Sequence, residues 1–261
     1  MATVFSVPTI NCDGVPPQPC STILAIDIGG TKVKILATGE TRPRKLESGR
    51  GLRPTEMVNA VQELAQDWEY EAVSIGYPGM VGDHGPRAEP GNLGCGWVGF
   101  NFAAAFNRPV RILNDAAMQA LGSYEGGRML FLGLGTGLGS AFLAEHVIVP
   151  MELGNLMYRD GRSLGEVAGR EGLKRLGKKA WCNALREIIA LLLQSFSVDY
   201  VVLGGGNAKL IDELPPGTRR GHNLTAFRGG FRLWSVDDVR TLLPNGNEFY
   251  TAPVLGPWRL I

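Results

Sequence analysis

The clearest pattern in the chain is a pair of apolar, β-branched runs on either side of two glycines. Residues 24–28 and 33–36 are mostly apolar, and Gly29-Gly30 lies between them. Runs of this kind around a glycine turn predict a β-hairpin whose tip carries no side chains. Glycine permits close approach of another group and also positive φ, so this tip is suited to a backbone-lined site.

The remaining apolar positions predict an alternation of buried strands and helices. Apolar residues recur at helical spacing from residue 57 to residue 65, and Thr55 is the expected N-cap of that helix. Short apolar runs bounded by glycine, proline and asparagine predict strands at 72–76, 110–113, 129–132, 140–144, 147–149 and 200–203. Further helices are predicted at 102–106, 116–124, 166–181 and 183–196.

The order of these elements repeats in outline. A hairpin with a glycine turn occurs near 24–38 and again near 129–149, which predicts two similar α/β lobes that face each other. We expect a flexible lead-in at 1–21, a small lobe at 22–114 and a large lobe at 115–235. We also expect a C-terminal tail at 236–261, which the pattern assigns to neither lobe.

Composition and charge exclude several classes of protein. The 261 residues are 44% hydrophobic, with 26 basic and 25 acidic side chains, so no global field favours nucleic acid or a membrane surface. Four widely spaced cysteines and three histidines suggest neither a zinc knuckle nor a disulfide framework. Residues 1–21 lack the pattern of a signal peptide, and no apolar run approaches the ~20 residues that span a bilayer. We expect a cytoplasmic protein that binds neither nucleic acid nor membrane.

Glycine is abundant, at 36 residues, and it clusters where a phosphate could be held. Asp27 ends the first strand beside Gly29-Gly30, at a point where a magnesium-bridged phosphate would take a carboxylate. The alternating glycines at 133–139 match neither the Walker loop nor the Rossmann spacing, so a phosphate clamp between two strands is the functional interpretation. Plain glycine turns are the alternative in both places.

Asp115 is the best candidate for a general base. Phosphoryl transfer to an alcohol needs a carboxylate that accepts the hydroxyl proton, and a helix N-terminus fixes the direction of such a group. Simple capping of the helix is the alternative. Glu152 follows a strand and is suited to hydrogen bonds with sugar hydroxyls, although a glutamate in a loop is also commonly just solvated.

Seven short motifs occur in a specific order. They are DIGGTK at 27–32, GYPGMV at 76–81, NL at 92–93 with GW at 96–97, NDA at 114–116, GTGLG at 135–139, ELG at 152–154 and GGG at 204–206. This order resembles the ROK family of sugar kinases, and within it polyphosphate glucokinases and their relatives. The resemblance covers roughly residues 22–235.

The resemblance implies the two-lobed α/β fold of actin-like, hexokinase-type (ribonuclease H-like) ATPases. It also implies transfer of a terminal phosphoryl group from ATP or inorganic polyphosphate, with Mg²⁺, to the 6-hydroxyl of glucose or a related hexose. Asp115 matches the catalytic base, and the matching sugar contacts are Asn92, Asn114, Asp115, Glu152, Asn155 and Glu166. The matching phosphate and nucleotide residues are Gly29, Gly30, Thr31, Lys32, Gly135, Thr136, Gly137, Gly204, Gly205 and Gly206, with Asp27 near the metal. The family often forms dimers, and the sequence leaves a homodimer open.

Three departures from the family pattern bear on these expectations. Asn155 stands where the family commonly has histidine; an amide can still bind a hydroxyl, but sugar specificity or rate is in question. Residues 158–172 contain no Cys or His, so the zinc motif of many relatives is missing and we predict no structural zinc. The segment 223–226 differs from the family's usual start of the last helix.

Two questions remain open at this point. A non-catalytic protein that binds sugar or nucleotide on the same fold is the alternative to a kinase. Lys174, Arg175, Lys178 and Lys179 are expected on one helical face, which would either guide polyphosphate or simply be solvated.

Overall fold

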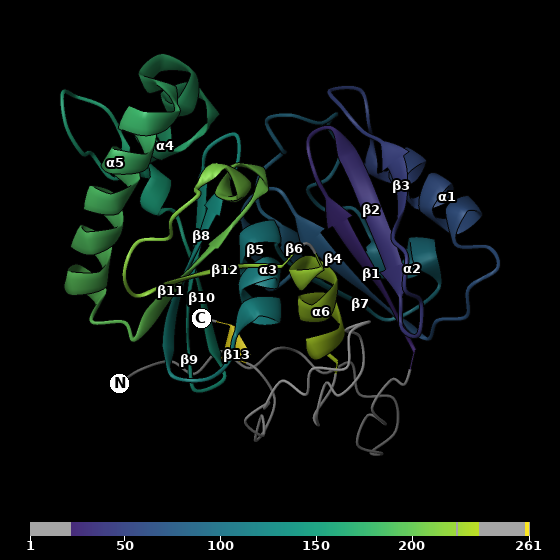
Figure 1. Cartoon of the computed structure of the whole chain (residues 1–261). Helices are drawn as coiled ribbons and strands as arrows, with labels where there is room; N and C mark the ends of the chain where they lie inside the picture. The colour runs from purple at the N-terminus through teal and green to yellow at the C-terminus, as the bar shows by residue number, and fades with distance from the viewer. Residues whose placement is uncertain (1–21, 223, 235–258, 261) are drawn as a thin grey trace, which may run out of the picture.

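The computed structural model describes residues 22–222, 224–234 and 259–260, which form two β-sheets with helices around and between them (Figure 1). The lead-in expected at 1–21, residue 223 and most of the tail expected at 236–261 lie outside the described residues. Among the helices that are described, none is both long enough and apolar enough to cross a membrane.

The first sheet contains the predicted hairpin and has the strand order β3-β2-β1-β4-β7. Its strands are β1 (Ile23–Ile28), β2 (Lys32–Ala37), β3 (Arg44–Glu47), β4 (Ala72–Tyr77) and β7 (Val110–Asn114). β1 and β2 pair in antiparallel fashion, with Ile28 opposite Val33, which confirms the hairpin. β4 and β7 run parallel to β1, so the carboxyl ends of these three strands meet at one edge of the sheet.

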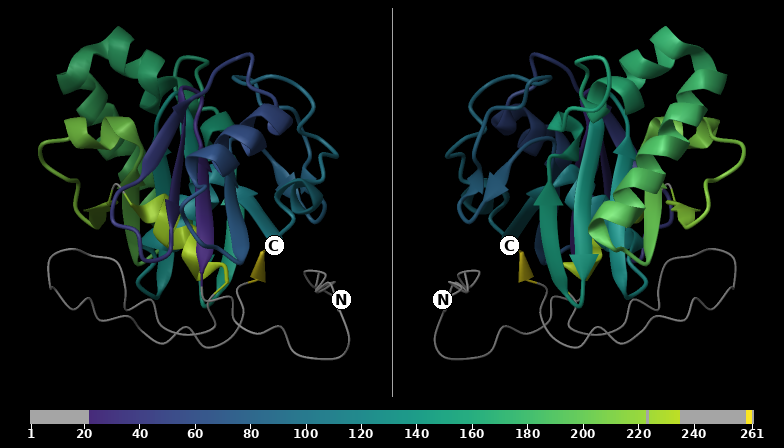
Figure 2. Two further views of the ribbon diagram at one scale, coloured as in Figure 1. Left: turned by 90° about the vertical axis from the view of Figure 1, so that its right-hand side faces the viewer. Right: turned by 90° about the vertical axis from the view of Figure 1, so that its left-hand side faces the viewer.

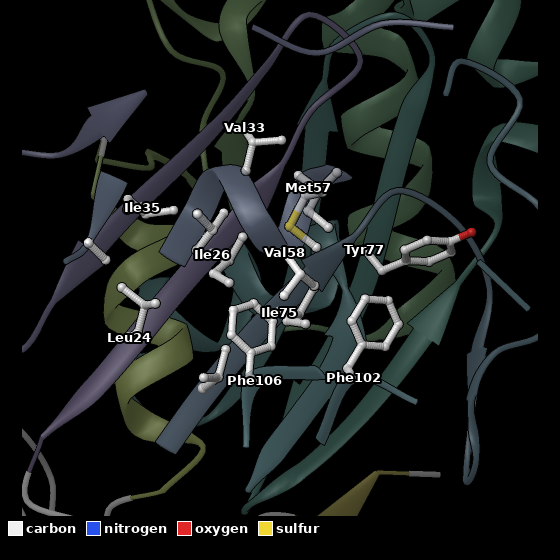
Figure 3. Close-up of a cluster of buried hydrophobic side chains, with 14 of the residues drawn as sticks. Leu24, Ile26, Val33, Ile35, Met57, Val58, Ile75, Tyr77, Phe102 and Phe106 are labelled. Atoms are coloured by element: carbon white, nitrogen blue, oxygen red, sulfur yellow. The ribbon is translucent and has the colours of Figure 1, made fainter. Parts of the chain in front are cut away.

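Two helices cover one face of this sheet, α1 (Pro54–Leu64) and α2 (Phe102–Phe106). Figure 3 shows the core between them and the strands, with labelled side chains Leu24, Ile26, Val33, Ile35, Met57, Val58, Ile75, Tyr77, Phe102 and Phe106. The expected N-cap at Thr55 is wrong, because Arg53 holds that position. Pro54 begins the helix, where its fixed φ suits the first turn and its missing N–H costs nothing. The short β5 (Val81–Gly82) and β6 (Gly85–Pro86) form a separate ribbon.

The second sheet repeats the arrangement of the first and has the order β12-β11-β8-β9-β10-β13. Its strands are β8 (Arg128–Leu134), β9 (Leu138–Ala144), β10 (Val147–Met151), β11 (Tyr200–Gly204), β12 (Thr218–Arg220) and β13 (Arg259–Leu260). β8 pairs with β9 in a hairpin on one side and with β11 in parallel on the other, as β1 does with β2 and β4. β13 adds a parallel strand beside β10, which the sequence pattern did not foresee.

Two helices lie between the sheets, α3 (Asp115–Ser123) and α6 (Thr225–Arg232), as Figure 1 shows. They cross closely, because a Cβ on Gly122 would lie 1.8 Å from the carbonyl oxygen of Thr225. α6 packs its apolar residues Phe227 and Phe231 on the first sheet. It lies in the segment assigned by sequence to the large lobe yet covers the other sheet, and the boundary at residue 114 stays a prediction.

The outer face of the second sheet is covered by α4 (Leu164–Ala168) and α5 (Arg170–Phe196), as the side views show (Figure 2). The expected break between helices at residue 182 is wrong. The backbone leaves the helical region at Gly177 instead, with φ 74° and ψ 160°. This conformation is open essentially to glycine alone, which Gly177 supplies. The short turns η1 (Leu153–Asn155) and η2 (Gly206–Leu210) complete this half.

Candidate active site

The turn at 29–32 closes tightly at the carboxyl end of β1. The Gly29 amide donates to the Lys32 carbonyl at 3.0 Å, and the Ser48 hydroxyl donates to the Gly29 carbonyl at 2.6 Å. Neither glycine of the pair has a positive φ. The turn therefore uses the other property of glycine, the absence of a Cβ, which lets a second segment approach.

That second segment carries Asn92. A Cβ on Gly30 would lie 2.2 Å from Asn92 Nδ2, so the structure places a predicted sugar ligand directly on the predicted phosphate turn. Glu89 shapes the loop, since its carboxylate accepts the Trp97 and Val98 amides at 3.1 and 3.2 Å. These backbone donors lower the pKa of Glu89, which keeps its carboxylate charged.

Asp27 lies near this turn and is paired with Lys34, a residue the sequence argument missed. The two face each other across the hairpin, and Lys34 Nζ is 3.3 Å from Asp27 Oδ2. Lys32, predicted to bind phosphate, is similarly paired with Glu47 at 3.3 Å, with the lysine half-exposed. Both lysines thus stand beside the glycine turn, and each is already paired with a carboxylate.

Asp27 could hold Mg²⁺ through Oδ1, since Lys34 is paired with its Oδ2. Within the described ranges, no group of three or more His, Cys, Asp or Glu side chains is arranged to hold a metal ion. Mg²⁺ commonly binds through one or two carboxylates together with substrate phosphates, and a single carboxylate beside a phosphate turn suits that mode. The absence of a structural zinc stays a prediction.

Asp115 begins α3 and has a strongly perturbed pKa. Its Oδ1 accepts the Ala116 amide at 2.8 Å. The pKa of Asp115 is raised from 3.8 to about 7, mainly by burial and then by the negative charges of Asp27 and Glu152, against the opposing effect of the Ala116 amide. Asp27 belongs to the first sheet and Glu152 follows the second, so Asp115 feels carboxylates from both halves of the molecule.

Asn114, rather than Asp115, caps α3. Its Oδ1 accepts the Ala117 amide at 3.1 Å, and its Nδ2 donates to the Gly79 carbonyl at 3.1 Å. The alternative role that the sequence left open for Asp115, simple capping, therefore falls to its neighbour. Asn114 also ties the GYPGMV loop to the start of the helix, and a sugar contact would use the remaining donor and lone pair of its amide.

Glu152 is exposed, directly after β10 and before η1. The following turn packs closely on its surroundings: a Cβ on Gly154 would lie 2.9 Å from the Leu138 carbonyl oxygen, and one on Gly165 would lie 3.0 Å from the Gly154 carbonyl oxygen. These contacts place the η1 turn beside α4. Asn155 is exposed on this turn, and its backbone N–H donates to the Glu152 carbonyl at 3.0 Å.

Glu166 caps its own helix. Its Oε2 accepts the Ser163 amide at 2.7 Å while its own amide donates to Ser163 Oγ at 3.2 Å, the reciprocal pattern of a capping box. The Ser163 amide is also the main reason that the pKa of Glu166 is lowered. One carboxylate oxygen therefore has a structural partner, and the sugar contact expected for Glu166 stays a prediction.

The two glycine-rich segments of the second sheet meet at its carboxyl edge. Gly205, at φ 79°, approaches the Leu134 backbone so closely that a Cβ would lie 2.5 Å from the Leu134 carbonyl oxygen. Asn207, which the sequence argument did not single out, donates to the Gly135 carbonyl at 3.2 Å. Thr136, Gly137, Gly205 and Gly206 are exposed, whereas Gly204 is buried against Phe131. The structure thus brings 135–137 and 204–206 together.

The basic residues of α5 do not form one helical face. Gly177 separates Lys174 and Arg175 from Lys178 and Lys179, so the helical spacing on which that expectation rested does not hold. Lys174 pairs with an acid of its own helix, Glu171, at 2.9 Å, and Lys178 pairs with Asp212 at 2.7 Å. These pairs neutralise part of the charge that was expected to attract a polyanion.

Comparison with known proteins agrees with this geometry. The model of the ROK family matches residues 23–150. A polyphosphate glucokinase of Mycobacterium tuberculosis is 25% identical over 221 residues, covering 73% of this chain and 80% of that protein. A bifunctional enzyme NanE/NanK of Brucella melitensis is 30% identical over 179 residues, which cover 61% of this chain. The chain matches only 33% of the length of that enzyme.

The fold also matches solved structures. The inorganic polyphosphate/ATP-glucomannokinase of Arthrobacter sp. strain KM superposes with a TM-score of 0.69 at 24% identity, covering 80% of this chain and 96% of that one. At this identity the match speaks for the fold alone. Together with the repeated strand order, it confirms the two-lobed, actin-like α/β fold of hexokinase type that the resemblance implied.

Proposed function

Because the chain belongs to the ROK family, we propose that it is a hexose kinase that phosphorylates the 6-hydroxyl of glucose or a related hexose. The donor is ATP or inorganic polyphosphate. The observation that carries the proposal is Asp115, a carboxylate fixed at a helix N-terminus with its pKa raised to about 7. A general base is most effective when its pKa lies near the working pH, because about half of it is then ionised and it is still strongly basic.

The step assigned to Asp115 is proton removal from the sugar. The 6-hydroxyl oxygen attacks the terminal phosphorus in line, the bond from that phosphorus to the bridging oxygen of the donor breaks, and the hydroxyl proton goes to Asp115 Oδ2. Oδ1 is held by the Ala116 amide, which leaves Oδ2 for the substrate. Because a loose phosphoryl transition state demands little covalent help, positioning and charge neutralisation carry the rest of the catalysis.

The other residues bind and orient. The glycine turn at 29–32 and the loop at 135–137 would bind phosphate oxygens through backbone N–H groups other than those of Gly29 and Gly135, which donate within their own turns. Lys32 and Lys34 would lie near the bound phosphate. Asn92, Asn114 and Glu152 would hold the hexose. Asp27 would hold Mg²⁺, which on binding would neutralise charge on the donor phosphates. The close approach of Asn92 to Gly30 supports an arrangement with the hexose next to the donor phosphate.

The names of two relatives support the choice of donors. The Mycobacterium tuberculosis relative is a polyphosphate glucokinase, and the Arthrobacter structure is an inorganic polyphosphate/ATP-glucomannokinase. The glycine segments suit either donor, because a backbone cradle binds the phosphate groups that both donors share.

The test is formation of hexose 6-phosphate from glucose and from mannose, with Mg²⁺ and either ATP or long-chain polyphosphate. Asp115→Asn is expected to lower kcat by on the order of a thousandfold or more, in the range ascribed to loss of key catalytic groups. Asp199→Asn is the matched control, since Asp199 pairs with Arg128 at the opposite, amino-terminal edge of β8. Equal loss in both variants would remove Asp115 from the role of base, and hexose binding without turnover would favour the non-catalytic alternative.

A further inference from the structure

The buried hydroxyl of Ser140 forms hydrogen bonds with the residues on both sides of Glu152. Ser140 lies on β9 and is only 1% exposed. Its Oγ donates to the Met151 carbonyl at 2.7 Å and accepts the Leu153 amide at 3.1 Å. The two hydrogen bonds therefore hold the residues immediately before and immediately after Glu152.

The backbone path explains why a hydroxyl is useful at this point. Met151 is the last residue of β10 and lies opposite Ser140 in the ladder. Glu152 then leaves the strand, with φ −112° and ψ 52°, and η1 begins at Leu153. The Leu153 amide is buried after this change of direction, and a buried N–H without a partner is costly. Ser140 supplies that partner from the neighbouring strand.

Strand β9 thereby contacts the residues next to two predicted site residues, Asp115 and Glu152. Successive residues of a strand point to opposite faces, and on β9 these are Gly139 and Ser140. Gly139 faces α3, where a Cβ would lie 3.0 Å from that of Ala116, the residue after Asp115. Ser140 faces the other way, toward the turn that carries Glu152.

We infer that Ser140 is a positioning residue, which sets the direction of the Glu152 carboxylate toward the hexose through hydrogen bonds on both sides of it. This inference rests on the proposed function, in which Glu152 binds the sugar. Ser140 does not touch the substrate in this scheme. Its hydroxyl matters because an exposed glutamate on a short turn has no direction of its own unless the backbone that carries it is fixed.

The chain offers a matched control for the loss of such a hydroxyl. Ser74, on β4 of the first sheet, is 0% exposed. Its Oγ donates to the Gly230 carbonyl at 2.6 Å and accepts Trp234 Nε1 at 2.8 Å. Ser74→Ala therefore removes the same group and the same number of hydrogen bonds from a buried strand position, but these bonds hold α6 and its end rather than Glu152.

The experiment compares Ser140→Ala, Ser74→Ala, Glu152→Ala and the double variant Ser140→Ala/Glu152→Ala by steady-state kinetics with glucose. Ser140→Ala is expected to raise KM for glucose about tenfold with kcat changed less than about threefold, the split that marks loss of binding common to ground and transition states. Ser74→Ala is expected to leave KM for glucose unchanged. In the double variant, Ser140→Ala should add less than about twofold to the effect of Glu152→Ala, because a residue that acts through another has no effect once that other side chain is removed.

The outcomes separate the two proposals. Wild-type turnover together with equal KM values in Ser140→Ala and Ser74→Ala would overturn the role of Ser140 and leave the kinase proposal intact. Fully additive effects in the double variant would overturn it as well. If the wild type shows no turnover, the kinase proposal fails, and calorimetric titration with glucose decides: weaker binding in Ser140→Ala supports positioning, while equal or undetectable binding overturns it. Should Ser140→Ala not fold, Ser140→Cys carries the same comparison, because a thiol of similar size is a much weaker donor and acceptor.

Discussion

The raised pKa of Asp115 predicts a steep pH dependence of kcat/KM. Burial first, then the charge of Asp27, raises this pKa from 3.8 to about 7. The base works only when ionised, so kcat/KM should rise with pH and level off above about pH 7. With a pKa of about 7, about one Asp115 in eleven is ionised at pH 6, and kcat/KM should be about a tenth of its plateau there. An ordinary aspartate would show no fall in this range.

Glu152→Gln tests the cause of the shift. Its charge raises the pKa of Asp115, but burial and Asp27 have larger effects. Removing the charge of Glu152 should therefore move the midpoint of the profile to lower pH while leaving it well above 3.8, the ordinary value for aspartate. Glu213→Gln is the control, because Glu213 is exposed and pairs with Arg186 rather than acting on Asp115.

The assay measures hexose 6-phosphate at fixed times between pH 5 and pH 9, with hexose well below KM. A stopped assay avoids coupling enzymes that have their own pH dependence. Phosphate groups of the donor titrate in the same range, so the decisive quantity is the difference between the profiles of Glu152→Gln and the wild type with the same donor. A wild-type profile that is flat from pH 5 to pH 8 would contradict a general base with a raised pKa. A Glu152→Gln midpoint equal to that of Glu213→Gln would contradict the contribution of Glu152 to that pKa.

Three further predictions concern folded stability and hexose binding. Above pH 7, Asp115→Asn should be more stable than the wild type by at most about 4 kcal/mol. The stability that the raised pKa of Asp115 gives to the wild type is complete below pH 3.8 and is lost as pH rises through about 7. If the difference between the two proteins in free energy of unfolding, measured with urea, is the same at pH 5 and pH 8, the prediction is contradicted. Gly30→Ala should raise KM for hexose about tenfold, since its Cβ would lie 2.2 Å from Asn92 Nδ2 and displace it. An unchanged KM would show that Asn92 has no role in binding. Gly122→Ala should lower the free energy of unfolding by about 3 kcal/mol, because its Cβ would lie 1.8 Å from the Thr225 carbonyl oxygen. Gly51→Ala is the control for both glycine variants, because a Cβ there meets nothing within 4 Å, and an equal effect in the control would contradict the steric argument.

The sequence predicts the sheets well because glycine turns and apolar runs carry local signals. The hairpin at 24–36 and the repeat near 129–149 both depend on contacts between neighbouring segments, and the structure has both. The helix break could not be placed, because a single glycine inside a helical pattern is often tolerated and Gly177 looks like such a case. The start of α1 was readable: Pro54 favours the first helical position, and this signal outweighs Thr55.

For the candidate site, local sequence identifies residue types but not which of them meet. The pairing of Asp27 with Lys34 could have been found, since the hairpin register that brings them opposite each other follows from the position of the turn. The contact of Asn92 with Gly30 could not have been found, because the two residues are 62 positions apart and only the folded loop brings them together. Ser140 gave no signal at all, since a serine inside an apolar strand has meaning only once its partners are known.

The basic residues of α5 were expected to share one helical face that attracts polyphosphate, and they do not. Their spacing would put Lys174 and Lys178 on one face of an ideal helix, but the backbone at Gly177 is not helical. Each of these lysines also has an acidic partner within 3 Å, and an exposed charge that is already paired attracts a distant polyanion only weakly at physiological salt. We therefore expect the glycine turns at 29–32 and 135–137, rather than this helix, to bind polyphosphate. Those turns would bind the terminal phosphate that polyphosphate and ATP have in common, so a preference between the donors must come from residues that contact the rest of each donor.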